Sequence, residues 1–574
     1  MNVSDYIVQF LYKKGIHDFF GYQGAMIAFF VDAIHRNAYI HNHSCYNEQG
    51  AAFAACGYSH ATRACGFAYA TSGPGAANLL SGIANAYFDS EAIIFLTGQL
   101  NTNEYAGIAG LRQQGVQEID IVSMSKPVTK WAVQLNKAED VKKVIENAWF
   151  LANTDRKGPV LIDLPMNIQR TEIQPEKLEG FAEPESIITD SFDECVSLIL
   201  KELADSKRPL VLAGNGLSET GRTELRKFIE RYQLPVITSM LAKSFLPSQH
   251  PLNFGYLGGT GMRVANLLSG LKADLLICLG ISICPRHTGA NMAEFVKNAR
   301  LIRVDIDQYQ LKRKISDQES NFCLDANCIV DKLSSINISY KPKLDWLMVC
   351  NECRAILEHI DDERPERYPN EQIKYFSQYA LENSIVASDV GQCMMWTAQS
   401  FVLKNGQKLL FSGGLGAMGF ALPAAIGAYY VNHKPVYCIS GDGAFQMNIQ
   451  ELEWVVREQL PIKMLIMNNE TLGLIRSFQN NNCSGRHEGT VKQFNYQPVS
   501  FSKIAKAYNI TCFETDDLRK IDSLDRCLAS PEPVLIELHL PENTEVIPKS
   551  YMIEPIYKQK PEIDDSLFNY LLSL

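Results

Sequence analysis

Short apolar runs, several of them rich in Val and Ile, alternate with helix-like segments along nearly the whole chain. Continuous apolar runs of this length are typical of strands buried on both faces, and strands that alternate with helices form parallel sheets. The pattern therefore predicts an α/β protein made of doubly wound parallel sheets. The predicted strands lie at residues 66–72, 92–98, 159–165, 209–216, 275–280, 301–306, 384–391, 435–443, 463–469 and 533–540.

The apolar runs fall into three groups that two polar stretches separate. Residues 171–186 carry prolines and few apolar side chains, and residues 337–346 interrupt the periodicity. Such stretches are typical of interdomain linkers, and 574 residues are enough for about three or four domains. We expect an N-terminal domain at 1–172, a central domain at 187–338, a C-terminal domain at 350–545, and a tail at 546–574 that lies over another domain.

Charge and hydropathy exclude two classes of partner. The formal net charge is -10 and no Lys- or Arg-rich run is present, so we expect no nucleic-acid ligand. Residues 1–20 mix charged and apolar positions as an amphipathic helix does, without the cleavage site of a signal peptide. No uncharged apolar run is long enough to cross a bilayer, so we expect no membrane partner.

The cysteines indicate a reducing compartment. There are 15 of them, scattered through apolar segments as small buried side chains would be, which predicts a cytoplasmic protein. Cys350 and Cys353 form a CxxC pair, but no second pair stands at the distance of a zinc site. We interpret the pair as two positions on one helix.

The local sequence with the clearest chemistry is Gly441-Asp442-Gly443, which follows a predicted strand. The next predicted strand ends at Asn469. A glycine turn lets backbone N–H groups approach a phosphate, and a carboxylate and an amide oxygen from adjacent strand ends can hold one hard divalent cation. A lone GDG is also a common structural turn, and it is the second strand end, with Asn469, that favours a metal-bridged diphosphate site.

Residues 440–478, which contain this turn, resemble the thiamine-diphosphate signature of the acetolactate synthase family. The resemblance extends over residues 5–545 through matching segments at 19–25, 47–62, 70–90, 389–396 and 412–427. It implies a pyrimidine-binding first domain, a central FAD-type (transhydrogenase-like) domain and a diphosphate-binding third domain.

Carried over position by position, the resemblance implies a magnesium ion and a diphosphate in the third domain. Asp442, Asn469 and the backbone carbonyl of Thr471 are the expected magnesium ligands. The residues expected to line the diphosphate are Gly441, Gly443, Ala444, Leu472 and Gly473.

The resemblance also implies the residues that act on the organic part of the cofactor. Glu48 matches the glutamate that exchanges a proton with the aminopyrimidine ring, a general acid–base role that burial favours. Met418 matches the apolar prop that bends the cofactor, and Gly416 the carbonyl beside it. Gln117 matches an amide near the reacting carbonyl. Further positions expected to line the cofactor are Gly24, Pro74, Asn78, Val390, Gly391 and Gln392.

The central domain of the biosynthetic family members binds FAD without redox chemistry. The matching positions here are Gly214, Gly216, Gly258, Arg286, Asp305 and Asp325. The family's RFDDR segment is SICPR in this chain, keeping only the last arginine, Arg286. We therefore expect FAD, with a vestigial site filled by side chains as the alternative.

The implied activity is that of a carboligase that depends on thiamine diphosphate and magnesium. It decarboxylates pyruvate and transfers the two-carbon unit to a second pyruvate, giving 2-acetolactate. Four departures alter the acceptor side and leave a nucleotide-linked keto-sugar open as an alternative acceptor. They are Gln23, Val116, Cys393 and Phe478.

Two further alternatives concern the reaction itself. A simple decarboxylase would need a proton donor, and His41 and His43 precede Glu48 in a segment that reads as a strand. A non-catalytic, regulatory relative would have no physical reason to keep Glu48, Asp442 and Asn469.

Glu48 and the GDG turn lie in different predicted domains. In the family the site assembles between the first domain of one subunit and the third domain of another. We therefore expect a homodimer or a homotetramer with active sites at the subunit interface.

Overall fold

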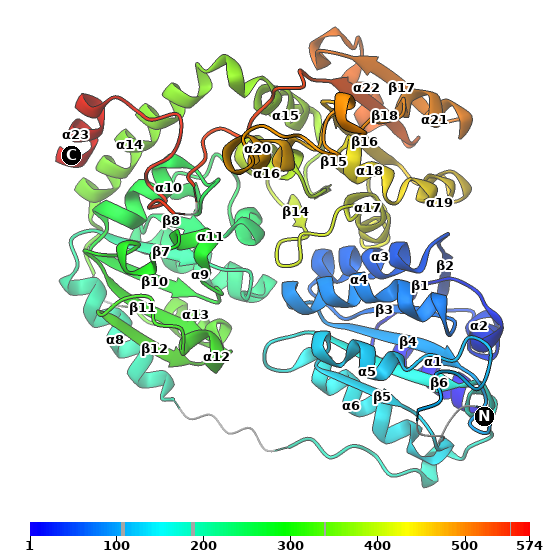
Figure 1. Cartoon of the computed structure of the whole chain (residues 1–574). Helices are drawn as coiled ribbons and strands as arrows, with labels where there is room; N and C mark the ends of the chain where they lie inside the picture. The colour runs from blue at the N-terminus through cyan, green and yellow to red at the C-terminus, as the bar shows by residue number, and fades with distance from the viewer. Residues whose placement is uncertain (105–109, 185–189, 338–339, 552) are drawn as a thin grey trace.

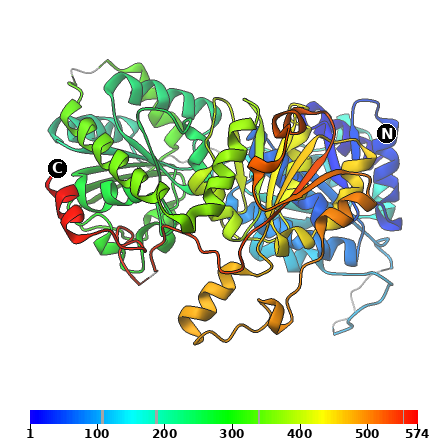
Figure 2. The ribbon, with the colours of Figure 1, turned by 90° about the horizontal axis from the view of Figure 1, so that it is seen from above.

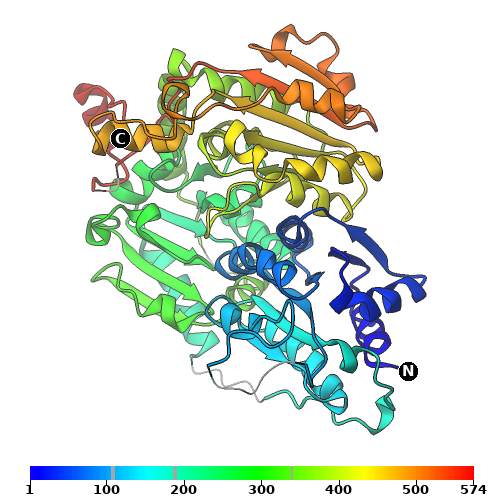
Figure 3. The ribbon, with the colours of Figure 1, turned by 45° about the vertical axis from the view of Figure 1, so that its right-hand side comes forward.

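The computed structural model describes residues 1–104, 110–184, 190–337, 340–551 and 553–574. They form three sheets, each of six parallel strands with helices on both faces (Figure 1). This confirms the predicted α/β fold of three parallel-sheet domains. Figure 3 shows the third domain stacked above the first, with the central domain beside both.

The first sheet has the strand order β2-β1-β3-β4-β6-β5. Its strands are β1 (Asp18–Gly21), β2 (His41–Ser44), β3 (Gly66–Ala70), β4 (Ile93–Gln99), β5 (Trp131–Gln134) and β6 (Pro159–Pro165). Its helices are α1 (Val3–Lys13), α2 (Ala28–Arg36), α3 (Glu48–Thr62), α4 (Pro74–Asp89), α5 (Ile121–Ser125), α6 (Val141–Asn153) and α7 (Met166–Gln169).

The central sheet has the order β12-β11-β10-β7-β8-β9, that of a dinucleotide-binding fold. Its strands are β7 (Pro209–Ala213), β8 (Val236–Thr238), β9 (Asn253–Tyr256), β10 (Leu275–Leu279), β11 (Arg300–Asp305) and β12 (Glu319–Cys323). Its helices are α8 (Phe192–Asp205), α9 (Glu219–Tyr232), η5 (Met240–Phe245), α10 (Arg263–Leu267), α11 (Pro285–Thr288), α12 (Gln308–Leu311) and α13 (Ala326–Ser335).

The third sheet has the order β14-β13-β15-β16-β18-β17, which repeats the topology of the first sheet. Its strands are β13 (Ile385–Ser388), β14 (Lys408–Phe411), β15 (Val436–Gly441), β16 (Ile462–Asn468), β17 (Thr511–Thr515) and β18 (Val534–His539). Its helices are α15 (Tyr368–Tyr379), α16 (Gln392–Ser400), α17 (Ala421–Tyr429), α18 (Asp442–Gln446), α19 (Leu452–Arg457), α20 (Gly473–Asn482), α21 (Phe501–Ala507) and α22 (Leu524–Ala529). Helix α14 (Leu344–Asp362) precedes them and packs against the core of the central domain.

Helices α3 and α17 join the first and third domains into one core (Figure 1). Their facing residues are small, and the backbones touch: a Cβ atom at Gly57 would lie 2.1 Å from the Ala424 carbonyl oxygen. A Cβ atom at Gly427 would lie 1.9 Å from the Ala54 carbonyl oxygen. This close approach fixes the start of α3, and therefore Glu48, against the third domain.

The C-terminal tail crosses the central domain and ends in α23 (Asp565–Ser573). Arg263 donates to the Pro561 carbonyl at 2.8 Å, Asn266 to that of Ile556 at 3.1 Å, and Lys272 to that of Leu571 at 2.7 Å. Side chains of the central domain thus satisfy backbone carbonyls of an otherwise irregular segment. Within the described ranges, no helix combines the length and the apolar character needed to cross a membrane.

Candidate active site

The predicted metal and diphosphate residues lie where the strand order of the third sheet reverses. Strands β13 and β15 are neighbours there, and their chain continuations lead to opposite sides of the sheet. The crevice at the carboxyl ends of two such strands is the usual ligand site of an open α/β sheet. Gln392 follows β13, Asp442 follows β15 and Asn469 follows β16, so all three side chains meet at one edge.

Asp442 has a carboxylate oxygen without a partner. Its side chain is buried, and among the described residues nothing bonds to Oδ2. Burial raises the pKa of Asp442 to about 7, although the Gly443 amide and the Tyr496 hydroxyl act in the opposite direction. Because an unpaired buried oxygen is costly, this donor is suited to a cation.

Asn469 is held so that its amide oxygen stays free. Its Nδ2 donates to Gln392 Oε1 at 2.8 Å and to Thr544 Oγ1 at 2.9 Å. Gln392 Nε2 in turn donates to the Thr544 carbonyl at 2.8 Å. With both N–H bonds committed, Oδ1 is the Asn469 atom left for a ligand.

Thr471 and the glycine turn complete this cluster. The Thr471 hydroxyl donates to the Thr490 carbonyl at 2.7 Å, and the predicted metal ligand at this position is the Thr471 backbone carbonyl. A Cβ atom at Gly443 would lie 2.5 Å from the Leu472 side chain, and one at Gly473 would lie 1.9 Å from Gln392 Oε1. A side chain at either position would therefore have to displace Leu472 or Gln392. Leu472 and Gly473 begin α20, whose first N–H groups are unpaired donors for a phosphate.

Met418 and Gly416 lie on the loop between β14 and α17. The Met418 methyl carbon lies 3.5 Å from where a Cβ at Gly443 would be, which places it beside the diphosphate turn. Gly416 has φ 73°, a conformation that favours glycine, and its Cβ position is open.

Helix α4 holds this loop across the domain boundary. Asp89 accepts from the backbone N–H of Gly414 at 2.7 Å and of Gly413 at 3.2 Å. Ser412 donates to Asn85 Oδ1 at 2.6 Å and accepts from the Ala417 N–H at 2.8 Å. The first domain therefore positions the loop that carries Met418.

Glu48 begins α3 and is buried. Its Oε2 accepts from Asn78 Nδ2 at 2.9 Å. A Cβ atom at Gly75 would lie 3.0 Å from Oε1, so the missing side chain makes room for the carboxylate. One oxygen is thus fixed by Asn78 and the other has space to exchange a proton.

The other predicted residues of the first domain gather near the same helix start. Pro74 begins α4, and a Cβ atom at Gly73 would lie 3.0 Å from the Cβ of Gln117. A Cβ atom at Gly24 would lie 2.5 Å from Thr71 Cβ, so the 19–25 segment passes close to the end of β3. The structure thus brings Glu48, Asn78 and Gln117 into one cluster around the start of α4.

The two clusters touch through neighbours of Glu48. Asn448 Nδ2 donates to Gln49 Oε1 at 3.1 Å and to the Gly419 carbonyl at 2.8 Å. Within the described part of the chain, however, no hydrogen bond joins Glu48 to Asp442 or Asn469. These residues of one chain therefore form two clusters, one around Glu48 and one around Asp442 and Asn469.

His43, considered above as a decarboxylase proton donor, is engaged elsewhere. Its Nε2 lies 2.9 Å from Asp18 Oδ1, its Nδ1 lies 3.2 Å from Glu458 Oε2, and its ring stacks on Tyr430. These contacts hold His43 at the packing interface of the first and third domains. They give no support to a decarboxylase role.

The predicted FAD positions show a mixed fit. Gly214 and Gly216 lie where the central strand order reverses, and burial raises the pKa of Asp305 at the end of β11. Asp325, in contrast, already accepts from the N–H and the Nδ2 of Asn327. Arg286 is exposed, and its carbonyl faces Gly258.

Several residues that organise the site were not predicted from the sequence. Asp89 and Asp389 stand inside the motif segments 70–90 and 389–396, and a buried acid in an apolar segment was the available signal. Asp389 accepts from the N–H groups of Gly419 and Ala421. Thr544 and Tyr496 carry no local signal, because their contacts arise only from the fold.

Three family models match the chain. They are the N-terminal TPP binding domain (residues 1–124), the central domain (196–333) and the C-terminal TPP binding domain (389–538) of thiamine pyrophosphate enzymes.

The curated relatives match over nearly their whole length. The acetolactate synthase large subunit of Lactococcus lactis subsp. lactis is 33% identical over 95% of this chain and 93% of its own. The acetolactate synthase isozyme 1 large subunit of Escherichia coli is 33% identical over 95% of both chains. A probable acetolactate synthase large subunit of Methanocaldococcus jannaschii is 32% identical over 98% of both.

Proposed function

This chain belongs to the acetolactate synthase large-subunit family of thiamine pyrophosphate enzymes, and from that premise we propose that it converts pyruvate to 2-acetolactate. The observation that carries the proposal is the pair of free oxygens, Asp442 Oδ2 and Asn469 Oδ1, at the strand ends of the third sheet. When bound, thiamine diphosphate supplies an electron sink for the decarboxylation of a 2-keto acid.

Magnesium would bind to Asp442 Oδ2, Asn469 Oδ1 and the Thr471 carbonyl. All three are hard oxygen donors of the kind that Mg²⁺ prefers, and the ion would supply positive charge to balance the diphosphate. The diphosphate would lie against Gly441, Gly443, Ala444, Leu472 and Gly473. The Val390–Gln392 turn would close the same cluster from β13, with Gln392 holding Asn469 in place.

Glu48 would serve as the proton carrier of the site. Asn78 orients the carboxylate through Oε2, and Oε1 would give a proton to the aminopyrimidine and take it back. Gln117 would donate its amide N–H to the oxygen of the reacting carbonyl as negative charge develops there. Met418 and the Gly416 carbonyl would hold the ring end of the cofactor in its bent shape.

A second copy of the chain would complete each site, in a homodimer or a homotetramer. Each of the two clusters would then be a half-site. Apolar side chains near both are exposed: Val116 is 81% exposed beside Gln117, and Phe478 is 60% exposed on α20. Met447 and Ile475 are exposed as well. Figure 2 shows α20 projecting from the body of the third domain. Apolar surface of this kind marks a protein interface, and two-fold symmetry would pair Glu48 of one copy with Asp442 of the other.

FAD is proposed for the central domain at Gly214, Gly216, Gly258, Arg286, Asp305 and Asp325. The glycines at the strand reversal and Asp305 are suited to a dinucleotide, whereas Asp325 is already bonded to Asn327. No step of the reaction is assigned to it. The visible absorption of the purified protein tests this: a flavin spectrum supports FAD, and a colourless protein that is fully active supports the vestigial alternative.

We also place the enzyme in the cytoplasm. All 15 cysteines are free thiols, as a reducing compartment requires.

The test is product analysis by mass spectrometry after incubation with thiamine diphosphate, magnesium and isotope-labelled pyruvate. One arm includes a nucleotide-linked keto-sugar. Acetolactate at equal yield in both arms supports the proposed reaction, whereas label in the sugar at the expense of acetolactate assigns the keto-sugar as acceptor. Acetaldehyde as the main product would contradict the carboligase assignment.

A further inference from the structure

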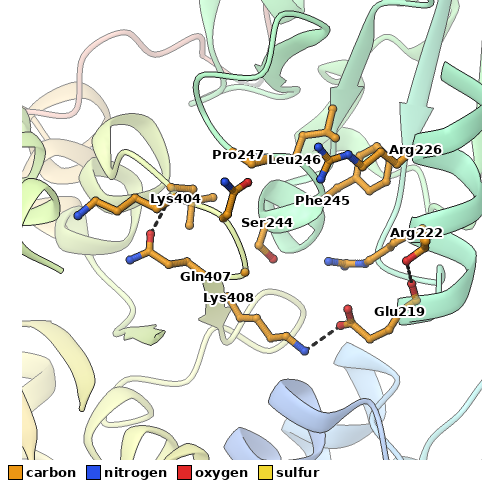
Figure 4. A pocket seen from close by; sticks show the side chains of 14 residues that line it. Glu219, Arg222, Arg226, Ser244, Phe245, Leu246, Pro247, Lys404, Gln407 and Lys408 are labelled. Carbon is orange, nitrogen blue, oxygen red and sulfur yellow. Dashed lines mark hydrogen bonds and ion pairs between the residues drawn. The ribbon is translucent and has the colours of Figure 1, made fainter. Parts of the chain in front are cut away.

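A cavity of about 170 Å³ lies between the central and third domains (Figure 4). One face of α9 and the turn at residues 244–247 form one side, and residues 403–408 form the other. Arg222 points into this space from α9, and the Ser244 hydroxyl faces it from the turn. None of the residues predicted for the cofactor site contributes to the lining.

Positive charge exceeds negative charge around the cavity. Lys408 pairs with Glu219 at 2.9 Å, and Glu219 is the one acidic residue in the lining. Arg63 and Arg222 both donate to the same atom, Asn215 Oδ1, at 2.6 and 3.2 Å. Within the described residues, neither arginine forms an ion pair with a carboxylate.

The two arginines lie close together, and too little negative charge lies near them to balance their positive charges. Arg222 is buried and Arg63 is half-buried, and in the described part of the chain Arg63 Nε has no hydrogen-bond partner. Burial and the charge of Arg63 lower the pKa of Arg222 to about 9. Buried cations are normally matched by anions, because leaving a charge out of water without a partner is costly.

Nearby groups do not remove this imbalance. Arg226 adds a further cation at the rim, where its Nε donates to Glu230 at 2.7 Å. Lys404 turns away, because its Nζ donates to the carbonyls of Gln378 and Ala380, both at 2.7 Å. Burial raises the pKa of Glu91, which is bonded to His60 on the far side of Arg63.

We propose that this cavity binds a small oxyanion, the phosphate or carboxylate group of a metabolite, with Arg222 as its principal ligand. The planar guanidinium donates two parallel N–H bonds to such a group, and Arg226 and Ser244 supply further donors. Nothing in the proposed reaction uses this site.

The site lies where the three domains meet, which gives the ligand a structural consequence. Lys408 of the third domain also donates to the Ala61 carbonyl of the first domain at 2.8 Å, and Arg63 reaches Asn215 of the central domain. A bound anion would neutralise repulsion between these groups. We expect it to raise the melting temperature of the whole chain, since a ligand that binds only the folded state stabilises it.

The experiment is calorimetric titration of the holoenzyme, saturated with thiamine diphosphate and magnesium so that the diphosphate site is filled. Inorganic phosphate is titrated in one arm and malonate in another, at constant ionic strength. We expect saturable binding of at least one of them, and the tighter one identifies the source of the oxyanion. Arg222→Gln should weaken that binding about tenfold or more, because it removes a charged double hydrogen bond.

Lys227→Gln is the matched control, since Lys227 is an exposed cation on α9 that does not line the cavity. If Arg222→Gln fails to fold, Arg226→Gln at the rim replaces it and should weaken binding several-fold. The proposal is wrong if neither phosphate nor malonate binds saturably. Equal affinity in the Arg222 or Arg226 variant and in Lys227→Gln would likewise refute it.

Discussion

At the scale of single residues, the hydrogen bonds within the chain determine which atoms of the site remain free to bind a ligand. Asn469 could present either its oxygen or its nitrogen to a ligand, and the bonds from Nδ2 to Gln392 and Thr544 leave the oxygen. Thr544, on the segment that follows β18, would therefore act on the proposed magnesium ion through Asn469.

Thr544→Val should weaken magnesium binding, because Asn469 then loses one of the two acceptors that orient it. Loss of such an outer partner lowers metal affinity about 10- to 100-fold. Magnesium titration of the activity measures it. Thr511→Val, an exposed threonine at the start of β17, is the control and should leave the titration unchanged. A Thr544 variant with the wild-type magnesium midpoint would show that Gln392 alone orients the amide.

A second residue-scale prediction concerns Cys284, whose Sγ lies 3.5 Å from His287 Nδ1. Burial alone would raise the thiol pKa, but the hydrogen bond and charge of His287 lower it to about 7. The thiolate therefore forms as the pH rises through about 7, and iodoacetamide should label Cys284 with a midpoint there. His287→Gln should shift the midpoint upward.

Cys328 serves as the internal control for this labelling. The residue is exposed overall. Partial burial of its thiol and the negative charge of Asp325 raise the pKa of this thiol. Equal labelling rates for Cys284 and Cys328 at neutral pH, followed by peptide mass spectrometry, would contradict the predicted thiolate.

At the scale of elements, helix α4 links the two half-sites of one chain. Its first turn carries Pro74 and Asn78 beside Glu48, and its last residue, Asp89, holds the loop that carries Met418. Burial raises the pKa of the Asp89 carboxyl, whereas the hydrogen bonds from the Gly414 and Gly413 N–H groups act in the opposite direction.

Asp89→Asn should weaken thiamine-diphosphate binding, because an amide has one acceptor oxygen where the carboxylate has two. Charged hydrogen bonds are worth about 1.5–3 kcal/mol, so we expect a rise of about 10- to 100-fold in the apparent Kd of the cofactor. Activation of the apoenzyme by added cofactor measures it. Asp522→Asn, at an exposed loop position, should have no effect; an equal shift in both variants would show that the loop does not depend on Asp89.

The sequence predicted interior strands and missed the edges of every sheet. The predicted apolar runs correspond to ten strands such as β4, β15 and β16, which are buried throughout. The edge strands β5, β9, β12, β14 and β17 were not predicted, and neither were the short interior strands β1 and β8; the edge strand β2 was expected only around His41 and His43. Edge strands such as β2, with the sequence HNHS, face solvent and carry no apolar signal.

The residues of the site also divide into those that the sequence predicted and those that it did not. Residues that follow a buried strand, such as Asp442 and Asn469, were found from the strand pattern, and Glu48 from family resemblance. Thr544 and Asp89 were not, because Thr544 reaches Asn469 across 75 residues and Asp89 reaches Gly414 across 325. Such contacts become visible only when the three sheets are placed together.

At the scale of the whole molecule, the proposed function makes the Glu48 cluster and the Asp442 cluster of one chain two half-sites, and exposed apolar side chains border both. The half-sites lie on the first and third domains, which share a core through α3 and α17. This account requires that Glu48 and Asp442 of different copies work together.

Mixing two inactive variants tests that requirement. If Glu48→Gln and Asp442→Ala are dissociated together and reassociated at random, about one quarter of all sites regain two intact halves in a symmetric dimer. The recovered acetolactate synthesis measures this fraction. If both residues of a site came from one chain, no mixture would contain an intact site and activity would stay at the level of the separate variants.

The most direct test of the central claim compares the wild type with Glu48→Gln on isotope-labelled pyruvate. The wild type should form labelled acetolactate only when both thiamine diphosphate and magnesium are present. Glu48→Gln should bind the cofactor but form acetolactate about 10²- to 10⁴-fold more slowly, as expected for loss of a general acid–base. Acetolactate formed without the cofactor, or equally fast by the Glu48 variant, would contradict this account of the enzyme.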